Sequence, residues 1–164
     1  MRNLTRILLV TTLLLGCVGC DQATKVVAKV HLRGGPAITL LHDTVRLTYA
    51  ENSGAFLGLG AALSESMRIL VFKIGVSLLT LGLILSAAFW PHLTRVQVVA
   101  LTLLGASGLG NLIDRVIHDG RVTDFLNLGI GGLRTGIFNV ADVLGVVGVA
   151  VLLLSRSAAA EPGR

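Results

Sequence analysis

Two aspartates, Asp124 and Asp142, are the residues of this sequence whose type and position best fit catalysis. Asp124 lies in the polar stretch VTDF, and Asp142 lies just inside the apolar run that begins at Ile137. An ionisable group within apolar membrane sequence is costly and therefore indicates function. Two carboxyl groups in one desolvated site cannot both ionise easily, so the pair holds a single proton near neutral pH. Such a pair can activate a water and protonate a scissile carbonyl or leaving amine.

Helical spacing predicts polar partners for these acids. Asn139 and Asp142 are three residues apart, so they project from one face of a helix. Asn111 and Arg115 share one face at the end of the preceding apolar run in the same way. If the two faces meet, Asp142 enters a polar pocket between helices, and the connecting segment can bring Asp124 to it.

Other roles for these residues stay open at this point. Asp124 could be a loop acid that caps a turn. Asp142 could neutralise Arg115 or Arg134 in a structural pair. Asp114 and Arg115 could form a surface ion pair. A small proton-coupled transporter also needs intramembrane aspartate, but the apolar runs have no inverted repeat and the polar residues gather at one end rather than at the midplane.

The composition predicts an integral membrane protein. Of the 164 residues, 53% are hydrophobic and 14% are charged, and the mean hydropathy is +0.82, which is too apolar for a soluble domain. We expect one mainly α-helical, polytopic domain with both termini on the cytoplasmic side, because the short N-terminus is basic. Four apolar runs approach the ~20 residues of a transmembrane helix, and they span residues 4–20, 68–90, 96–113 and 137–154.

The remaining charges indicate lipid rather than nucleic acid as a partner. The net charge of +5 is dispersed, and no basic patch interleaved with aromatic residues is present, so no nucleic acid is expected. Membrane lipid is the ordinary partner for such residues. Lys73 lies one turn inside the second run, where we expect it to snorkel rather than to form a site. The sequence has no metal-binding or phosphate-binding motif, and we expect neither metal nor cofactor.

A polar region, residues 31–66, predicts a small extracytoplasmic β element. Alternation over Thr44–Tyr49 has the period of a strand. Asn52 to Gly54 (NSG) predicts a turn that could instead face an extended peptide, and Ala55–Leu59 forms an apolar edge that could dip into lipid. Upstream, Asp21 and Lys25 are four residues apart, which predicts an ion pair at the membrane edge.

The first apolar run has two interpretations. Its basic start, apolar core and LLLGC ending at Cys17 are similar to a cleavable lipoprotein signal. An uncleaved first span is favoured, because a cut before Cys17 would remove the helix that carries Asp21. Cys17 and Cys20 form a CxxC, but no further Cys or His lies at ligand spacing, so helix packing is the simpler role.

Five motifs in series resemble the signal peptidase II (lipoprotein signal peptidase) family over nearly the whole chain. They are DQATK (21–25), NSGAF (52–56), GNLIDR (110–115), GRVTDF (120–125) and FNVAD (138–142). The resemblance implies a bacterial inner-membrane aspartyl endopeptidase that cleaves diacylglyceryl-modified prolipoproteins before the lipidated Cys. It departs from the family pattern at Ser107, where Gly is usual, and in NSGAF, where the commoner form has a second Ala.

The resemblance also implies roles for individual residues. Asp124 and Asp142 would be the catalytic pair. The residues that would bind substrate or support the site are Asp21, Lys25, Asn52, Gly54, Asn111, Arg115 and Asn139. A mobile extracytoplasmic loop or short helix would cover the site, which would lie on the extracytoplasmic face, and the loop after Arg115 fits that description. Lipopeptide or macrocyclic inhibitors are further expected ligands of a monomeric enzyme. The alternative is a catalytically silent membrane protein of the same fold that binds a lipopeptide.

Overall fold

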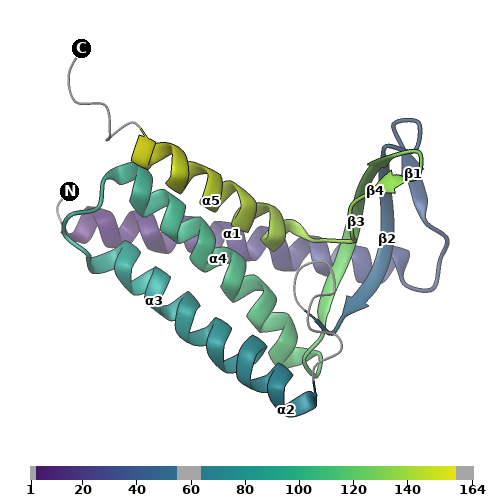
Figure 1. Ribbon diagram of the computed structural model, residues 1–164, viewed down its shortest axis with the longest axis horizontal. Coiled ribbons are helices and arrows are strands. Elements are labelled where there is room, and N and C mark those ends of the chain that lie inside the picture. The colour runs from purple at the N-terminus through teal and green to yellow at the C-terminus, as the bar shows by residue number, and fades with distance from the viewer. Residues whose placement is uncertain (1–2, 55–63, 158–164) are drawn as a thin grey trace.

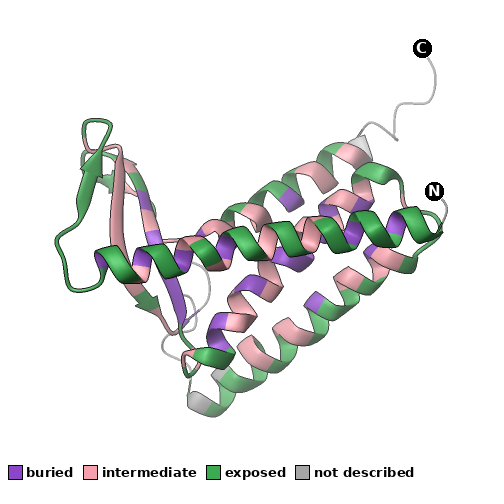
Figure 2. Ribbon diagram, turned by 180° about the vertical axis from the view of Figure 1, so that it is seen from behind, coloured by how far each residue is buried: buried purple, intermediate pink, exposed green. Residues whose placement is uncertain are grey.

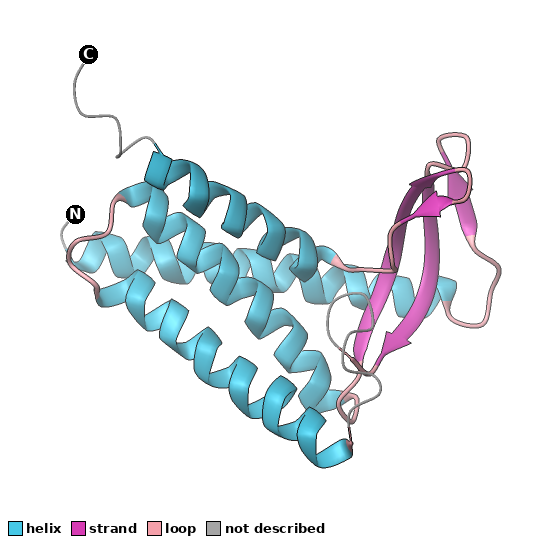
Figure 3. Cartoon of the chain, viewed as in Figure 1, coloured by secondary structure: helices cyan, strands magenta, loops and turns pink. Residues whose placement is uncertain are grey.

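A bundle of helices carries a small antiparallel sheet at one end, as the computed structural model shows (Figure 1, Figure 3). The structure describes residues 3–54 and 64–157. The helical segments are α1 (Asn3–Leu32), α2 (Glu65–Arg68), the π-helix η2 (Ile69–Gly75), α3 (Val76–Phe89), α4 (Arg95–Ile117) and α5 (Val140–Ser157). The start of α1 and the end of α5 both lie at the end of the bundle away from the sheet (Figure 1), as an even number of spans requires.

Three helical stretches are long and apolar enough to cross a membrane, judged by length and composition within the described residues. They are Asn3–Leu32, Ile69–Phe89 and Arg95–Ile117. The fourth expected span corresponds to a shorter apolar stretch, Val140–Ser155. At 1.5 Å per residue, its whole helix of 18 residues reaches about 27 Å, close to the ~30 Å of a hydrocarbon core.

The burial pattern is inverted relative to a soluble protein. Large apolar side chains such as Leu78, Leu79 and Leu154 are exposed on the outside of the helices, whereas the buried positions include many charged and polar side chains. Figure 2 shows the exposed faces turned outward along the bundle. Lipid can solvate the apolar exterior, so the interior is free to hold a polar centre.

Helix α4 is the central helix, because it packs against α1, α3 and α5. Glycines permit the close approach to α3: a Cβ at Gly105 would lie 2.6 Å from Ile84 Cγ1, and a Cβ at Gly108 would lie 2.1 Å from Thr80 Oγ1. The small-residue segment GASGLG (residues 105–110) therefore packs helices closely.

The end of the bundle away from the sheet is fixed by capping. The buried Arg6 donates from Nε, Nη1 and Nη2 to the carbonyls of Ala87 (2.7 Å), Trp90 (2.6 Å) and Ser86 (3.0 Å). A cation suits the carbonyl-rich end of a helix, so Arg6 joins α1 to the end of α3. At the start of α4, Thr94 and Gln97 form a capping box.

The four strands are antiparallel in the order β1–β2–β3–β4. They are β1 (Ile38–Leu40), β2 (Val45–Asn52), β3 (Val122–Ile130) and β4 (Leu133–Arg134). The predicted strand at Thr44–Tyr49 is confirmed as β2, and β2 pairs with β3 so that Ala50 lies opposite Asp124. A register shift between Leu47 and Ala50 interrupts this ladder, as a β-bulge does.

α1 extends beyond the first expected span, residues 4–20, and continues to Leu32, and the first strand of the expected β region begins at Ile38. One expectation was wrong: the segment after Arg115, expected to be a loop over the site, forms β3 and β4. Tertiary partners and not local pattern decide the structure of this segment. The apolar edge expected at Ala55–Leu59 lies outside the described residues.

Candidate active site

Asp124 is held by β3 rather than by a flexible loop. On one side of it, the backbone N–H of Thr123 donates to Asp114 Oδ2 of α4 at 2.8 Å. On the other side, the N–H of Phe125 donates to the carbonyl of Phe138 at 3.0 Å, and Leu126 and Phe138 form a β-bridge. The same bridge places the next residue, Asn139, beside Asp124. Both neighbours of the acid are therefore fixed by backbone hydrogen bonds.

Asp142 is fixed by a capping box at the start of α5. Asn139 is the N-cap residue: its Oδ1 accepts from the N–H of Asp142 at 3.1 Å, and Asp142 Oδ2 accepts from the N–H of Asn139 at 3.1 Å. The side chains of Asn139 and Asp142 therefore satisfy two free N–H groups at the start of the helix. These are the two residues that the i, i+3 spacing puts on one helical face.

Asn139 also joins the two acids. Its fully buried side-chain amide donates to Asp124 Oδ1 at 2.6 Å and to Asn111 Oδ1 at 3.1 Å. Asn111 in turn donates to Asp142 Oδ1 at 3.1 Å. The face that carries Asn111 therefore meets the face that carries Asp142, which is the condition that the sequence left open. Each carboxyl group is oriented by amides and retains lone pairs for a substrate or water.

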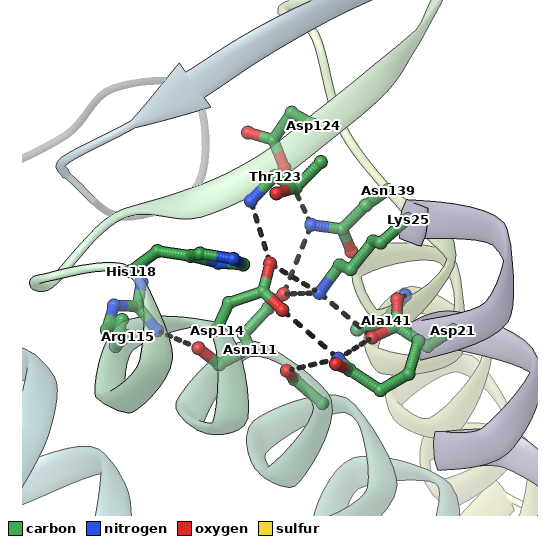
Figure 4. Close-up of polar contacts among 12 residues, drawn as sticks. Asp21, Lys25, Asn111, Asp114, Arg115, His118, Thr123, Asp124, Asn139 and Ala141 are labelled. Atoms are coloured by element: carbon green, nitrogen blue, oxygen red, sulfur yellow. Dashed lines mark hydrogen bonds and ion pairs between the residues drawn. The ribbon is translucent and has the colours of Figure 1, made fainter. Parts of the chain in front are cut away.

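A buried ionic network lies behind this pair (Figure 4). Lys25 Nζ lies 2.9 Å from Asp21 Oδ2 and 3.4 Å from Asp114 Oδ2, and it donates to Asn111 Oδ1 at 2.9 Å. Asp21 Oδ1 accepts from the N–H of Ala141 at 2.9 Å, so α1 caps the first turn of α5. The ion pair predicted between Asp21 and Lys25 is confirmed, and it connects α1, α4 and α5.

The NSG turn closes the site from the sheet side. Asn52 Nδ2 donates to Asp124 Oδ2 at 3.0 Å, and Asn52 Oδ1 accepts from the N–H of Gly54 at 2.9 Å. The carbonyl of Gly54 accepts from Arg115 Nη2 at 3.1 Å. Asn52 therefore forms the predicted turn and is also a direct neighbour of Asp124.

The environment of Asp124 favours its protonated form. The pKa of this carboxyl is raised from 3.8 to about 6; burial is the largest cause, the charge of Asp142 acts in the same direction, and the hydrogen bonds from Asn52 and Asn139 oppose the shift. The side chain is 2% exposed, so loss of hydration is the main cause. A carboxyl with this pKa exchanges a proton near neutral pH.

All nine candidate residues belong to one connected set of contacts. The structure corrects one alternative: Asp114 does not form a surface pair with Arg115, because it is buried and bound to Lys25 and Thr123. Arg134 does not neutralise Asp142; its bonds go to Asp43 and Asn127.

Sequence reasoning missed two members of the site, Asp114 and Gln22. Gln22 Nε2 donates to Asp21 Oδ2 at 3.1 Å, to the carbonyl of Gly110 at 3.0 Å and to Asp114 Oδ1 at 3.2 Å. The position of Asp114, three residues after Asn111 on the same helical face, was a usable signal. Gln22 carried no comparable signal. Within residues 3–54 and 64–157, no group of three or more His, Cys, Asp or Glu side chains could hold a metal ion.

A polytopic helical membrane protein with a buried, acid-rich polar centre is the class that this fold and site define. Residues 13–157 match the family model described as signal peptidase (SPase) II. The chain is 33% identical over 147 residues to the lipoprotein signal peptidase of Chlorobium phaeobacteroides, covering 84% of this chain and 83% of the relative. It is 36% identical over 134 residues to that of Halalkalibacterium halodurans, covering 82% of each.

Solved structures agree with these relatives. A bacterial membrane enzyme structure determined by the in meso method at 2.3 Å resolution superposes with a TM-score of 0.77 at 28% identity, covering 94% of this chain and 93% of that one. A second, at 1.9 Å resolution, gives a TM-score of 0.76 at 26% identity, covering 89% and 90%. The chain belongs to the signal peptidase II family, and it is a bacterial membrane peptidase.

Proposed function

We propose that this protein is an aspartic endopeptidase with Asp124 and Asp142 as its catalytic pair. The observation that carries the proposal is the position of Asn139, whose side chain donates to Asp124 and whose backbone N–H donates to Asp142. One buried residue therefore orients both carboxyls toward a common centre. We further propose that the substrate is a diacylglyceryl-modified prolipoprotein cut before its lipidated Cys, because the relatives are named lipoprotein signal peptidases.

In the proposed reaction, one ionised carboxylate takes a proton from water while the water oxygen attacks the carbonyl carbon before the Cys. The protonated partner gives its proton to the carbonyl oxygen, which forms a tetrahedral diol. The C–N bond then breaks: the first acid protonates the leaving amine, and the second regains a proton from the diol. The products are the carboxylic acid of the signal peptide and a new amino terminus, and the pair ends with its single proton. The pKa of about 6 for Asp124 suits the acid that holds this proton at the start.

The surrounding polar residues act through the pair. Asn111 and Asn139 fix the carboxyl orientations, and Asn52 binds the outer oxygen of Asp124. Asp21 and Lys25 support the start of α5 from behind. Gly54 and Arg115 lie at the edge where an extended substrate backbone would enter. These are positioning or binding roles, and only the two acids exchange protons.

Two apolar grooves support a substrate that approaches from the bilayer. One, of about 390 Å³, lies between β4 and α5 and includes Arg134, Phe138 and Val146. The other, also about 390 Å³, lies between α4 and α5 and includes Ser107, Gly145 and Val146. Both end at Asp142. Acyl chains or an apolar signal segment lying in them would bring the scissile bond to the polar centre.

The proposal includes the placement of the enzyme in the membrane. Both termini are cytoplasmic, and the sheet and the polar centre lie at the extracytoplasmic face, where translocated prolipoproteins are found. The enzyme acts as a monomer, since every proposed catalytic residue comes from one chain. Lipopeptides or macrocycles that enter the apolar grooves and bond to the acids would inhibit it.

The decisive experiment is cleavage of a purified diacylglyceryl prolipoprotein by wild type, Asp124→Asn and Asp142→Asn. Each variant should lose at least about a hundredfold in rate, the lower range for acid–base catalysis, while its circular dichroism spectrum stays that of wild type. Asp43→Asn is the matched control: this exposed acid lies in the β1–β2 turn at φ 68°, a conformation that Asn also tolerates. Activity retained by either dyad variant would refute the catalytic pair, and binding without cleavage by wild type would favour the silent lipopeptide-binding protein.

A further inference from the structure

A second polar cavity lies beside the candidate active site, on the side of Arg115. It has a volume of about 190 Å³ and is lined by residues of α4, of the turn after α4 and of η2, far more room than one water needs. Its charged lining residues are Lys73, Arg115, Arg121 and Asp119. The proposed peptidase reaction uses none of the side chains that η2 and the turn contribute.

Arg115 presents an unused hydrogen-bond donor at this cavity. The residue is only 6% exposed; Nη2 donates to the carbonyl of Gly54 at 3.1 Å and Nη1 to that of Asn111 at 3.5 Å. Its Nε is buried and has no partner among the described residues. A buried charged donor without an acceptor is costly. An anionic ligand in the cavity would supply the acceptor.

Lys73 provides a second cation without an ion pair in the described part of the chain. It comes from η2. π-helical turns are rare in proteins, and those that occur often lie at functional sites. Its Cε lies 3.7 Å from where a Cβ at Gly120 would be, so the side chain reaches across to the turn after α4. The sequence predicts that Lys73 snorkels, and in the structure its side chain lines this cavity.

The charge of the cavity is positive even after its own pairs are counted. Arg121 is neutralised by Glu51, 2.8 Å away, and Asp119 is the acid in the lining. Within the lining, Lys73 and Arg115 remain as two cations against that one acid, and the carboxylates of Asp142, Asp124 and Asp114 also act on the charge of Arg115. An arginine with an available N–H beside a lysine is a combination that binds phosphate oxygens.

Part of the cavity lining is apolar. Ile69 and Phe72 line it, and Ile69 continues into the exposed apolar surface at Leu70 and Val71. The centroid of the Phe72 ring lies 5.6 Å from Arg115 Cζ, which makes a cation–π contact with the guanidinium. A cationic wall next to an exposed apolar helix start fits a ligand with a phosphate head and an acyl tail.

We propose that this cavity binds the phosphodiester headgroup of an anionic membrane phospholipid, with Lys73 and Arg115 Nε contacting the phosphate and an acyl chain following Ile69. The diacylglyceryl group of the proposed substrate carries no phosphate, so the ligand is a bilayer lipid rather than the substrate. Because Arg115 also bonds to the backbone of Asn111, which orients Asp142, the bound lipid holds one wall of the active site in place.

The test is native mass spectrometry of the full chain released from detergent containing either phosphatidylglycerol or phosphatidylcholine. Wild type should retain one phosphatidylglycerol in preference to phosphatidylcholine. Lys73→Gln should reduce that retention about tenfold, an energy change of ~1.4 kcal/mol, and Lys73→Arg should restore it. The control is Arg33→Gln, which removes an exposed cation on the sheet side and should retain lipid as wild type does.

The remaining outcomes overturn the proposal. Equal lipid retention by wild type and Lys73→Gln would refute the proposed lipid site. Inorganic phosphate is tested in a separate arm. If it binds as tightly as the lipid does, the cavity is an anion site with no lipid specificity. If Lys73→Gln only slows cleavage of substrates with acidic residues near the cut, the ligand is peptide. Lipid retention is also read in Asp124→Asn, so failure of the lipid site and failure of the proposed peptidase are distinguishable.

Discussion

Asn139 and Asp142 cap one another at the start of α5, with two reciprocal bonds of 3.1 Å between side chain and backbone. The same acid is one of the two proposed catalytic carboxyls. The capping box that begins α5 therefore also fixes the orientation of Asp142. One arrangement thus stabilises the start of the helix and holds the carboxyl group in position for the proposed reaction.

Substitution of Asn139 should separate these two roles. Asn139→Ser keeps a hydroxyl that can cap Asp142 but removes the amide that donates to Asp124, so cleavage should fall at least tenfold with little loss of stability. Asn139→Ala removes the cap as well and should cost a further ~1 kcal/mol in the free energy of unfolding. Cleavage rates and thermal unfolding in detergent measure the two effects. Wild-type activity in Asn139→Ser would contradict a positioning role.

Lys25 should be essential for stability rather than for chemistry. Lys25→Met leaves Asp21 and Asp114 buried without their shared cation, and loss of one partner from a buried pair costs ~3–5 kcal/mol. Lys29→Met is the matched control one turn further along α1, where the contact is a 3.3 Å approach to His118 Nε2. The unfolding temperature of Lys25→Met should lie far below that of the control. Equal unfolding temperatures would mean that the network contributes little.

The raised pKa of Asp124 predicts a pH-dependent stability cost. Between pH 3.8 and about 6 the folded state binds more protons than the unfolded state, so stability falls as pH rises through this window. The cost approaches ~3 kcal/mol above the folded-state pKa. The difference in unfolding free energy between Asp124→Asn and wild type should therefore shift in favour of the variant from pH 4.5 to 7.5. Asp43→Asn should show no such shift, and a constant difference for Asp124→Asn would exclude the raised pKa.

The apolar grooves should control substrate affinity. Val146 is 61% exposed and lines both grooves, so Val146→Trp fills them and leaves both carboxyl groups unchanged. KM for a lipidated substrate should rise about tenfold or more with kcat less affected, the pattern expected when ground-state binding is lost. Leu154→Trp, on an exposed face of the same helix outside either groove lining, should behave as wild type. A raised KM for Leu154→Trp with an unchanged KM for Val146→Trp would show that the substrate does not bind in these grooves.

Helical periodicity was enough to predict most of the membrane part. The apolar runs located the helices, and the i, i+3 spacing correctly placed Asn139 beside Asp142. The i, i+4 spacing of Asp21 and Lys25 likewise predicted their ion pair. These relationships are local, so a single sequence contains them.

Long-range pairing was not predictable in the same way. Nothing near Val122 indicated that β3 would pair with β2 on one side and with Phe138 on the other, yet this pairing brings Asp124 to Asn139. The inward position of Asp114 depends on Lys25, 89 residues away in the chain, and neither residue alone reveals it. The sequence predicts only that the connecting segment can bring Asp124 to Asp142, whereas in the structure the strand β3 fixes the position of Asp124.

The continuity of α1 has a consequence for self-hydrolysis. The enzyme carries its own LLLGC segment ending at Cys17, and that segment lies in the middle of a helix that runs without a break from Asn3 to Leu32. A peptidase needs an extended chain at the bond it cuts, so local unwinding would have to precede attack. Arg6 anchors the helix on one side of Cys17 and Asp21 anchors it on the other. The two anchors oppose that unwinding. The helix α1, which supports the candidate active site, therefore also resists cleavage of its own LLLGC segment.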